Sequence, residues 1–431
     1  MQKRIGKVLV CSSLVVCLMA GLTSFGGAET TLSLWDQKNS PKEREAVEYI
    51  IGIFEKEYPE VKITRRIMPN LEADQMVRMA FAGGTPPDLS ECQDPYTMVK
   101  YFQKGLTMDL TEWYKEYGDR YPLGVKSAMN FDGYYIAVPM AELVTMAVFY
   151  NKKLLADLGL TEPENYGEFC QALEAAKARG LTPIPIGTKA GWPGLHIYQH
   201  FLRETVGAAT INDMIFRTDP NKGPRWTDPG FVRAAKYVDE MRQNGYFSKG
   251  AAMSSFDAGK MEWLGGRGPF FITGSWVPSF DFPPGFEWDF FWFPHIVGEL
   301  GYYRNDDYID LFASLQVSST TSHPELCLDF LEVWTRPEVQ HKAWFEIANF
   351  IPVVKGAAPE EELSKFQKAQ LELSKHNTGT YHAMDCWMPP AVGFGALYSD
   401  MTALFAGEIT PIELGKHMEK VHVEELKKLQ E

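Results

Sequence analysis

The sequence is poor in the features that mark enzymes, redox proteins and membrane proteins. It contains no G-x-S-x-G nucleophile turn, and its glycine-rich stretch Gly265–Gly268 lacks the spacing of a phosphate-binding loop. Beyond the N-terminus no apolar run reaches the length of a membrane span. The cysteines after the N-terminal segment include no CxxC pair and are widely spaced: Cys92, Cys170, Cys327 and Cys386. The sequence therefore gives few indications of catalysis.

Basic residues are also scarce. Lys and Arg number 42 against 56 Asp and Glu, which gives a formal net charge of −14 at pH 7. A surface with this balance repels phosphate backbones and anionic lipid headgroups. We therefore expect no nucleic acid and no membrane surface among the partners.

The first 28 residues have the order of a cleaved secretory signal. The basic residues are Lys3, Arg4 and Lys7, the apolar run is Val8–Leu22, and the small residues at −3 and −1 are Gly26 and Ala28. Valine precedes both cysteines of this segment, where lipoprotein processing needs a small residue. We expect cleavage after Ala28, a mature net charge of −17, and a soluble periplasmic protein. Export permits disulfides, although Cys170 on an apolar helix face is equally consistent with a buried free thiol.

The chain is long enough for two hydrophobic cores. Its 431 residues exceed what one core usually serves. Near the start, Thr31–Trp35 and Val61–Ile67 read as strands, and Ser40-Pro41 opens an amphipathic helix between them. This β–α–β pattern predicts a parallel sheet, with the loop after Trp35 at its ligand-binding carboxyl edge.

The stretch Asp132–Leu160 predicts a hinge. A turn signal and the strand Tyr134–Val138 lead into Pro139, which cannot donate to a sheet ladder. A second apolar run, Leu143–Phe149, follows after the acid Glu142. Two strands separated by a proline indicate a chain that leaves one sheet and enters another, with a cleft between two lobes.

Several segments together resemble the extracellular solute-binding proteins that supply sugars to ABC importers, the family that includes the maltodextrin-binding proteins. They occur in the family's order across nearly the whole mature chain: FEKEYPEVKI, AFAGGTPPDL, DGYYIAVPM, VFYNKKLLADLGL, NYGEFCQALEAAKARGLTPI, GPFFITGSW, SSTTSHPELCLDFLEVWTRPEVQ, IPVVK and FAGEITPIELGKHMEK. The chain departs from the family pattern at EWLGGRG and at NDDYID.

The resemblance implies a two-lobed α/β fold of the periplasmic-binding-protein type (type II). Each lobe is expected to hold a mostly parallel sheet flanked by helices, and three crossings should join the lobes near Val138–Glu142, Phe290–Phe293 and Val317–Thr321. The N-terminal lobe would comprise residues 29–139 plus 292–319, and the C-terminal lobe residues 140–291 plus 320–431. The ligand would lie between the lobes.

A sugar site needs two kinds of side chain. Carboxylates and amides bind hydroxyl groups, and flat aromatic rings cover the C–H faces of the sugar. In this chain such residues alternate where strands are expected to end, and acids lie near the expected crossings. The predicted ligand-binding residues are Asp36, Gln37, Gln93, Asp94, Glu142, Lys189, Trp192, Trp276, Asp310 and Trp387.

Each of these residues also has an ordinary structural explanation. Tryptophans are common in cores, an Asp after a strand often caps a helix, a hinge acid can bind backbone N–H groups, and lysines are usually solvated. His196 and His200 have the i, i+4 spacing of helix-borne metal ligands, but Ile197 stands where the catalytic Glu of that motif belongs. We therefore predict no metal and no cofactor.

The favoured hypothesis is a monomeric, non-enzymatic receptor that binds a mono- or oligosaccharide by hinge closure and delivers it to an inner-membrane ABC permease. A sugar phosphate or another polar metabolite is the first alternative, with Lys189 and Arg304 as the basic candidates. A secreted glycoside hydrolase that uses two carboxylates is the second, although the eight strand–helix repeats of a barrel are absent from the sequence.

Overall fold

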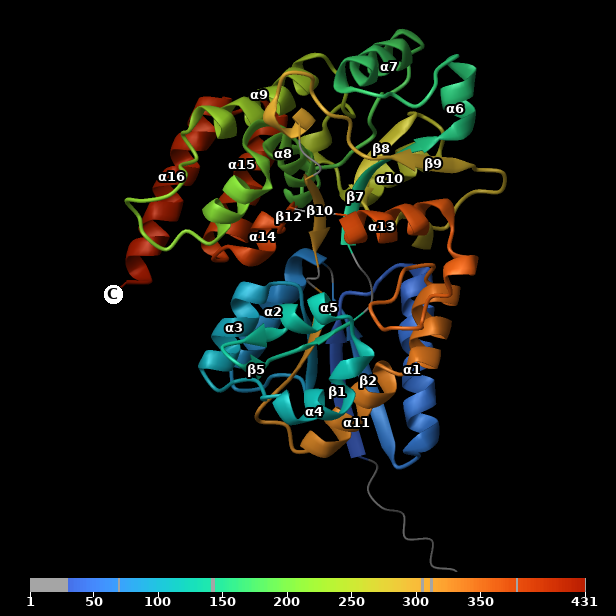
Figure 1. Ribbon diagram of the computed structural model, residues 1–431, viewed down its shortest axis with the longest axis vertical. Coiled ribbons are helices and arrows are strands. Elements are labelled where there is room, and N and C mark those ends of the chain that lie inside the picture. The colour runs from blue at the N-terminus through green and yellow to red at the C-terminus, as the bar shows by residue number, and fades with distance from the viewer. Residues whose placement is uncertain are drawn as a thin grey trace, which may run out of the picture.

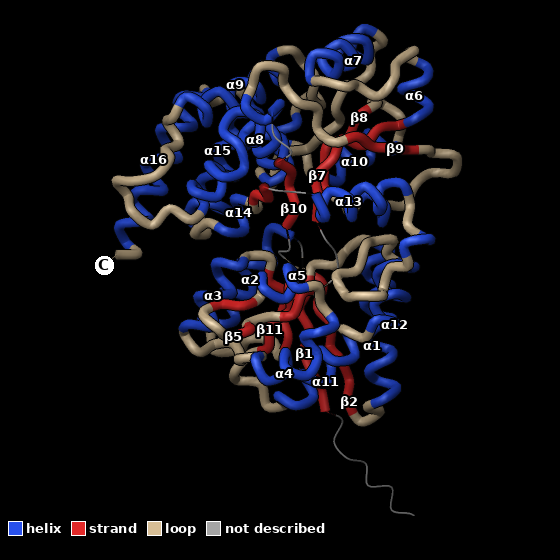
Figure 2. The backbone as a smooth tube through the Cα atoms, in the orientation of Figure 1, coloured by secondary structure: helices blue, strands red, loops and turns tan. Residues whose placement is uncertain are grey.

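The structure is a computed structural model and describes residues 30–68, 70–140, 144–303, 306–310, 313–376 and 379–430. Two lobes lie one above the other along the longest axis, and each is built on its own sheet (Figures 1 and 2). Within the described residues no helix has both the length and the apolar character of a membrane span. The predicted signal peptide lies outside these residues.

The first lobe is built on a five-stranded sheet with the order β2-β1-β3-β11-β6. β1 runs parallel to β2 and β3, whereas β11 runs antiparallel to β3 and β6. The strands are β1 (Thr30–Asp36), β2 (Val61–Ile67), β3 (Leu89–Cys92), β6 (Val138–Pro139) and β11 (Ser314–Val317), and β4 (Asn130–Phe131) pairs with β5 (Tyr134–Tyr135) in a separate hairpin.

Helices cover this sheet, and local signals explain the first of them. Ser40 caps α1 (Pro41–Glu57) in a capping box with Glu43, and the apolar face of α1 is buried on the sheet, so the predicted β–α–β unit is confirmed. The other helices of the lobe are α2 (Asn70–Ala82), α3 (Pro95–Gln103), α4 (Thr111–Tyr117), α5 (Leu123–Ala128), α11 (Pro324–Trp334), α12 (Pro337–Gln340), a 3-10 turn at Gly118–Arg120 and a π-helix at His341–Ile347.

The second lobe is built on a sheet with the order β12-β10-β7-β8, in which β9 also pairs with β7. Its strands are β7 (Val144–Asn151), β8 (Phe270–Gly274), β9 (Trp288–Phe291), β10 (Asp306–Asp310) and β12 (Gly379–Tyr381). Its helices are α6 (Lys152–Asp157), α7 (Tyr166–Ala178), α8 (Trp192–Ile215), α9 (Pro229–Gln243), α10 (Phe256–Leu264), α13 (Lys365–His376), α14 (Met384–Trp387), α15 (Tyr398–Ala406), α16 (Pro411–Lys428), a π-helix at Ala391–Leu397 and 3-10 turns at Ala251–Met253, Val277–Ser279, Leu300–Tyr303 and Glu360–Glu362.

The α/β class and the two-lobed fold are as predicted, but the second sheet differs from the predicted parallel one. β7 runs antiparallel to β8, β9 and β10, and among the described strands of this sheet the parallel pair is β10 and β12. Apolar runs reveal strands but do not encode their direction, which depends on where the connecting helices return the chain.

The order of the described elements places three passages of the chain between the lobes. The first passage lies between β6 and β7, at the predicted hinge, and Glu142 lies outside the described residues. The second lies between β10 and β11. The segment Phe290–Phe293 is therefore not a crossing, because β9 pairs with β7 and its phenylalanines join apolar clusters of the second lobe.

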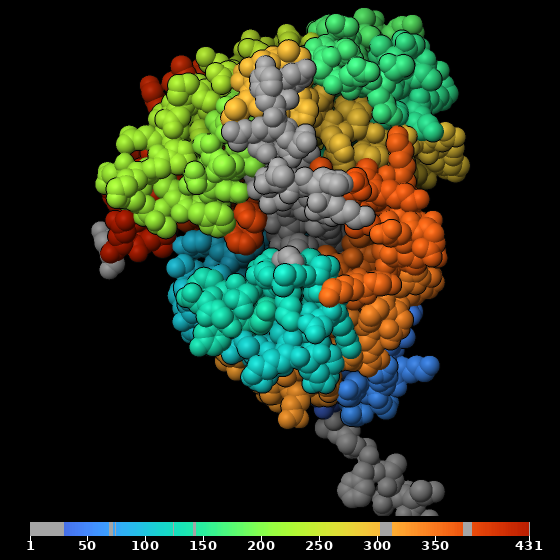
Figure 3. Space-filling view, viewed as in Figure 1, coloured from blue at the N-terminus to red at the C-terminus, as the bar shows by residue number. Residues whose placement is uncertain are grey.

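The third passage follows Ala357, which packs in the core of the first lobe, and precedes Phe366, which packs in the second. In Figure 3 the orange surface of this part of the chain runs along the right side from the lower lobe to the upper one. The predicted crossing at Val317–Thr321 is wrong, since Ser318 and Ser319 bond to backbone oxygens of the first lobe.

The packing also differs from the predicted division into lobes. That division placed residues 320–431 in the second lobe, yet α11 packs on α1, with the rings of Phe330 and Phe54 5.2 Å apart. Trp334 and Trp344 belong to the same core. An amphipathic pattern shows that a helix covers a sheet but not which sheet it covers. We propose a first lobe of 30–139 plus 314–357 and a second lobe of 144–310 plus 366–430.

Candidate ligand site between the lobes

The carboxyl ends of β1 and β3 point toward the second lobe. β1 enters at the lower end of the molecule in Figure 1 and rises toward the upper lobe, and β3 runs parallel to it. The residues that follow these strands are therefore brought to the interface. They include the predicted ligand residues Gln37, Gln93 and Asp94, and the predicted residue Asp36 is the last residue of β1 itself.

Asp36 is buried and bound to the guanidinium of Arg65. Nε and Nη2 of Arg65 donate to its two carboxylate oxygens at 2.7 and 2.8 Å, and Lys38 N–H donates to it as well. Burial raises the pKa of Asp36, and the guanidinium opposes that rise. The Asp36 carboxylate thus holds Arg65 and the loop after β1 in place through these hydrogen bonds.

Glu91 is a central polar residue of this edge that the sequence analysis did not select. It is fully buried in β3, one residue before the strand ends. Its carboxylate accepts a 2.7 Å bond from Gln37 N–H and a 3.2 Å bond from Gln93 Nε2, and its Oε1 lies 3.6 Å from Lys38 Nζ. Its position in the segment ECQDPY, where a strand was expected to end, could have marked it as a site residue. Its partner Lys38 is distant in sequence, so the pairing could not be read from the sequence.

Gln37 has an unusual environment. Only 4% of it is exposed, and neither the oxygen nor the nitrogen of its side-chain amide has a hydrogen-bond partner within the described part of the chain. A buried amide without partners is costly, and most such groups in proteins are satisfied. This amide can therefore serve a ligand without breaking an internal bond.

Asp94 has a structural role. It is the N-cap of α3, accepts a 3.0 Å bond from Thr97 N–H and binds the Thr97 hydroxyl, and it is fully buried. The Asp-Pro pair at this point was the signal of a cap. Direct contact with a ligand would require these bonds to rearrange.

In the second lobe, the structure brings Trp192 and Trp276 together. Their ring centroids are 5.9 Å apart, and the imidazole of His196 lies 5.1 Å from the first and 6.0 Å from the second. Both indoles are half-buried. Trp192 opens α8, and Trp276 follows the end of β8, so the two elements present their rings at one place.

Two glycines allow this arrangement. Gly191, the N-cap of α8, has φ +79°, and a Cβ there would lie 2.4 Å from Cβ of Tyr398. At Gly274 a Cβ would lie 2.1 Å from the indole of Trp276. Trp192 therefore follows a glycine, Gly191, and Trp276 lies against a second glycine, Gly274. At either position a larger residue would require neighbouring atoms to move.

Trp276 also lies where the lobes meet. It packs against the apolar clusters of both lobes and against the aromatic cluster around Phe271 and Phe290. Directly after it, Ser279 Oγ lies 3.4 Å from Ser40 Oγ of the first lobe, and Lys42 Nζ donates to Pro278 O at 3.2 Å. The loop after β1 and the loop after β8 therefore face each other.

The remaining predicted residues are more scattered. Trp387 is half-buried on α14, which contacts α3 of the first lobe, and its ring lies 4.4 Å from His382. Lys189 is exposed. Asp310 pairs through its backbone with Val144, its side chain lies outside what the structure describes, and Arg304 and Glu142 are outside the described residues.

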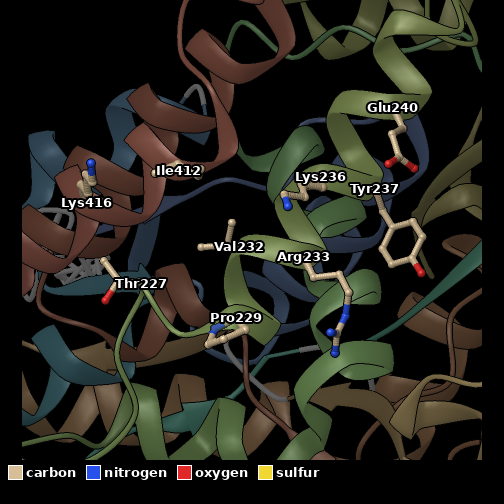
Figure 4. Close-up of a pocket in the computed structure, with 9 residues that line it drawn as sticks. All are labelled: Thr227, Pro229, Val232, Arg233, Lys236, Tyr237, Glu240, Ile412 and Lys416. Atoms are coloured by element: carbon tan, nitrogen blue, oxygen red, sulfur yellow. The ribbon is translucent and has the colours of Figure 1, made fainter.

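A separate groove of about 740 Å³ lies on the second lobe (Figure 4). It is lined by α9 and the start of α16, including Val232, Lys236, Ile412 and Lys416. None of its lining residues is a predicted ligand residue, so it is distinct from the site between the lobes.

Comparison with known proteins yields a consistent set of matches. The family model described as bacterial extracellular solute-binding protein matches residues 38–341. An uncharacterised ABC transporter extracellular-binding protein of Pyrococcus horikoshii is 22% identical over 65% of this chain and 68% of its own length. The multiple sugar-binding protein of Streptococcus mutans is 25% identical over 49% of this chain and 47% of its own. A solved chitin oligosaccharide binding protein superposes with a TM-score of 0.83 at 22% identity, over 93% of this chain and all of that one.

Proposed function

Because the chain belongs to the bacterial extracellular solute-binding protein family, we propose that it is the receptor of an ABC importer and binds a saccharide between its lobes. The observation that carries this proposal is Trp276. Its half-buried ring packs against the cores of both lobes beside Trp192, opposite the polar loop that holds Gln37. Aromatic faces and amides together suit the two surfaces of a sugar.

The names of similar proteins support the same ligand class. The Streptococcus mutans relative is a multiple sugar-binding protein, and the superposed structures include a chitin oligosaccharide binding protein and one in complex with raffinose. We propose that the ligand is a mono- or oligosaccharide, that Gln37, Glu91, Gln93, Trp192 and Trp276 contact it, and that Trp387, Lys189, Glu142 and Asp310 lie around them. Asp36 and Asp94 support the loops that carry these groups.

The charges on the first-lobe side of the site favour a neutral ligand over a sugar phosphate. In the first lobe, Arg65 is bound to Asp36, and Lys38 lies beside the buried Glu91. A phosphate requires cations that are not already neutralised.

The same bonds count against a glycoside hydrolase. That chemistry needs one carboxyl free to give a proton and a second free to act on the sugar or on water. Asp36 is held by a guanidinium and Asp94 by Thr97. A receptor needs neither a proton-donating carboxyl nor a second catalytic carboxylate, so we propose that the protein is not an enzyme. We further propose that the protein is a monomer, that it acts in the periplasm, and that it delivers its ligand to an inner-membrane permease.

A thermal-shift screen tests the function directly. Galactose, raffinose, chitotriose and maltotriose are suitable probes, and a saccharide present at 100 times its Kd adds about 2.7 kcal/mol to the free energy of unfolding. Stabilisation without consumption of the sugar supports the receptor, whereas release of reducing ends would support the hydrolase.

Trp276→Ala tests the site. Loss of the indole should reduce the saccharide-induced shift by most of its size, because stacking on an aromatic ring is removed from the point where both lobes meet. Trp192→Ala should act in the same direction. Trp288→Ala is the matched control, since Trp288 is also half-buried but makes ring contacts with Phe149, Phe282 and Phe366 instead. An unchanged shift in both site variants would remove the tryptophans from the ligand site.

A further inference from the structure

His196 lies beside the tryptophan pair, and among the described residues its Nδ1 accepts and donates no hydrogen bond. It stands one helical turn after Trp192 on α8, and its ring is in contact distance of both indoles. Only 7% of it is exposed, and its Nδ1 is buried with no hydrogen-bond partner in the described ranges. The Nδ1 nitrogen of this residue is thus unsatisfied at the place where the aromatic rings converge.

The charge state of His196 suits a neutral hydroxyl. Burial lowers the pKa of His196 to about 3, so the ring is uncharged near neutral pH. A neutral imidazole has one donor and one acceptor nitrogen, and a sugar hydroxyl can likewise both donate and accept. A buried ring in this state is costly without a partner, and a ligand that supplies the bond removes that cost.

We propose that His196 is a ligand-binding residue, and that it hydrogen-bonds a saccharide hydroxyl beside Trp192 and Trp276. The inference rests on the proposed function and deepens it. Within the described residues, the site then combines an unpartnered polar group from each lobe, Gln37 from the first and His196 from the second. Contact with both groups requires both lobes, which links hydroxyl recognition to closure.

His200 provides an internal control. It lies one turn further along α8, is 2% exposed, and neither of its ring nitrogens has a partner among the described residues. Its ring stacks on Phe293 at 4.6 Å, inside the second lobe. The two histidines therefore share burial and lack of partners and differ in their contact with the tryptophans.

The test compares His196→Phe with His200→Phe by isothermal titration calorimetry, with chitotriose, raffinose, maltotriose and galactose as probes. His196→Phe keeps the ring and removes the nitrogens, and we expect affinity to fall about 10- to 100-fold. The melting temperature of the unliganded variant should not fall, because an unpaired buried polar group has been removed. His200→Phe should bind within about twofold of the wild type, and His196→Gln, which retains a donor and an acceptor, should recover part of the lost affinity.

Each outcome has a defined meaning. If His196→Phe binds a probe within twofold of the wild type, the inference is overturned while the proposed function stands. Equal losses of affinity in His196→Phe and His200→Phe, with lower melting temperatures, would show a structural role and also overturn it. If the wild type binds none of the saccharides, the proposed function fails first, and the inference with it.

Discussion

At the scale of the residue, Gly274 determines where the indole of Trp276 lies. The indole folds back over the end of β8, into the space that a side chain at position 274 would occupy. The contact does not involve an unusual backbone angle, so the requirement is for space alone. A single methyl group at this point is therefore a direct test of whether the position of Trp276 matters for binding.

We predict that Gly274→Ala weakens saccharide binding at least tenfold. The added Cβ would lie 2.1 Å from the ring, and the ring must move away from its contacts with both lobes. Calorimetry measures the affinity, and thermal unfolding measures the accompanying loss of stability, about 1–3 kcal/mol for an overpacked site.

Gly52→Ala is the control for that substitution. Gly52 is exposed on α1 and nothing lies within 4 Å of its Cβ position, so alanine should stabilise the helix by about 0.5–1 kcal/mol without changing affinity. Unaltered binding in Gly274→Ala would show that the ring position is unimportant.

At the scale of the element, α16 is held to the second lobe by a small polar cluster. Trp226 Nε1 donates to His422 Nδ1 at 3.2 Å, and Glu419 accepts from Arg217 Nη1 at 3.1 Å and from Trp226 N–H at 3.0 Å. His422 can accept this bond only as a neutral ring. Burial, with a smaller effect of Arg217, lowers its pKa to about 4.

This pKa predicts a pH dependence of stability. Below about pH 6.5 the unfolded chain binds a proton at His422 before the folded chain does. The contribution of the neutral ring is therefore complete above pH 6.5 and is lost as the pH falls toward 4. In urea unfolding, the loss of stability between pH 7 and pH 4.5 should be about 1–3 kcal/mol smaller in His422→Gln than in the wild type.

Glutamine is chosen because its side-chain oxygen can still accept from an indole N–H while carrying no charge at either pH. Identical pH profiles for the two proteins would show that the titration of His422 does not act on folding. His196 and His200 are unchanged in both proteins, so their own contributions cancel in the comparison.

At the scale of the whole molecule, the described elements are connected by three passages between the lobes, and the lobes touch through the loops after β1 and β8. Such an arrangement permits rotation of one lobe against the other. A ligand favours the closed form only if it gains contacts there that the open form lacks. The shape of the molecule in solution should therefore respond to saccharide.

We predict that a bound saccharide reduces the radius of gyration of the wild type, and that Ser40→Cys/Ser279→Cys abolishes this change when oxidised. The two hydroxyls are 3.4 Å apart across the interface, within reach of a disulfide after small rotations. Small-angle scattering with and without saccharide and reductant gives the measurement.

The single variants are the controls for that experiment. Ser40→Cys also removes the cap of α1, at a cost of about 1 kcal/mol, and this effect must be separated from the cross-link. The reduced double variant should contract like the wild type. Equal contraction in the oxidised and reduced forms would contradict the hinge.

Features that depend on residues close together in the sequence were predicted correctly, and features that depend on residues far apart were not. The first strand, predicted at Thr31–Trp35 and observed at Thr30–Asp36, and the capped helix after it depend on neighbours within a few residues, and both were predicted. Asp94 was predicted as a ligand residue although Asp-Pro is also a local cap signal, so here two local explanations competed. Glu91 and His196 were not selected as ligand residues because their meaning depends on partners far along the chain.

The sequence by itself determined the class of the fold, the position of the first hinge, and the pairing of strand and helix at the start of the chain. These properties follow from hydrophobic periodicity, caps and turns, which act over short distances. Only the tertiary structure decided that α11 covers the first sheet, that β9 stays in the second lobe, and that Trp192, His196 and Trp276 meet. The reason is physical: an apolar face has no preferred partner until competing faces are packed, and that choice depends on the whole chain at once.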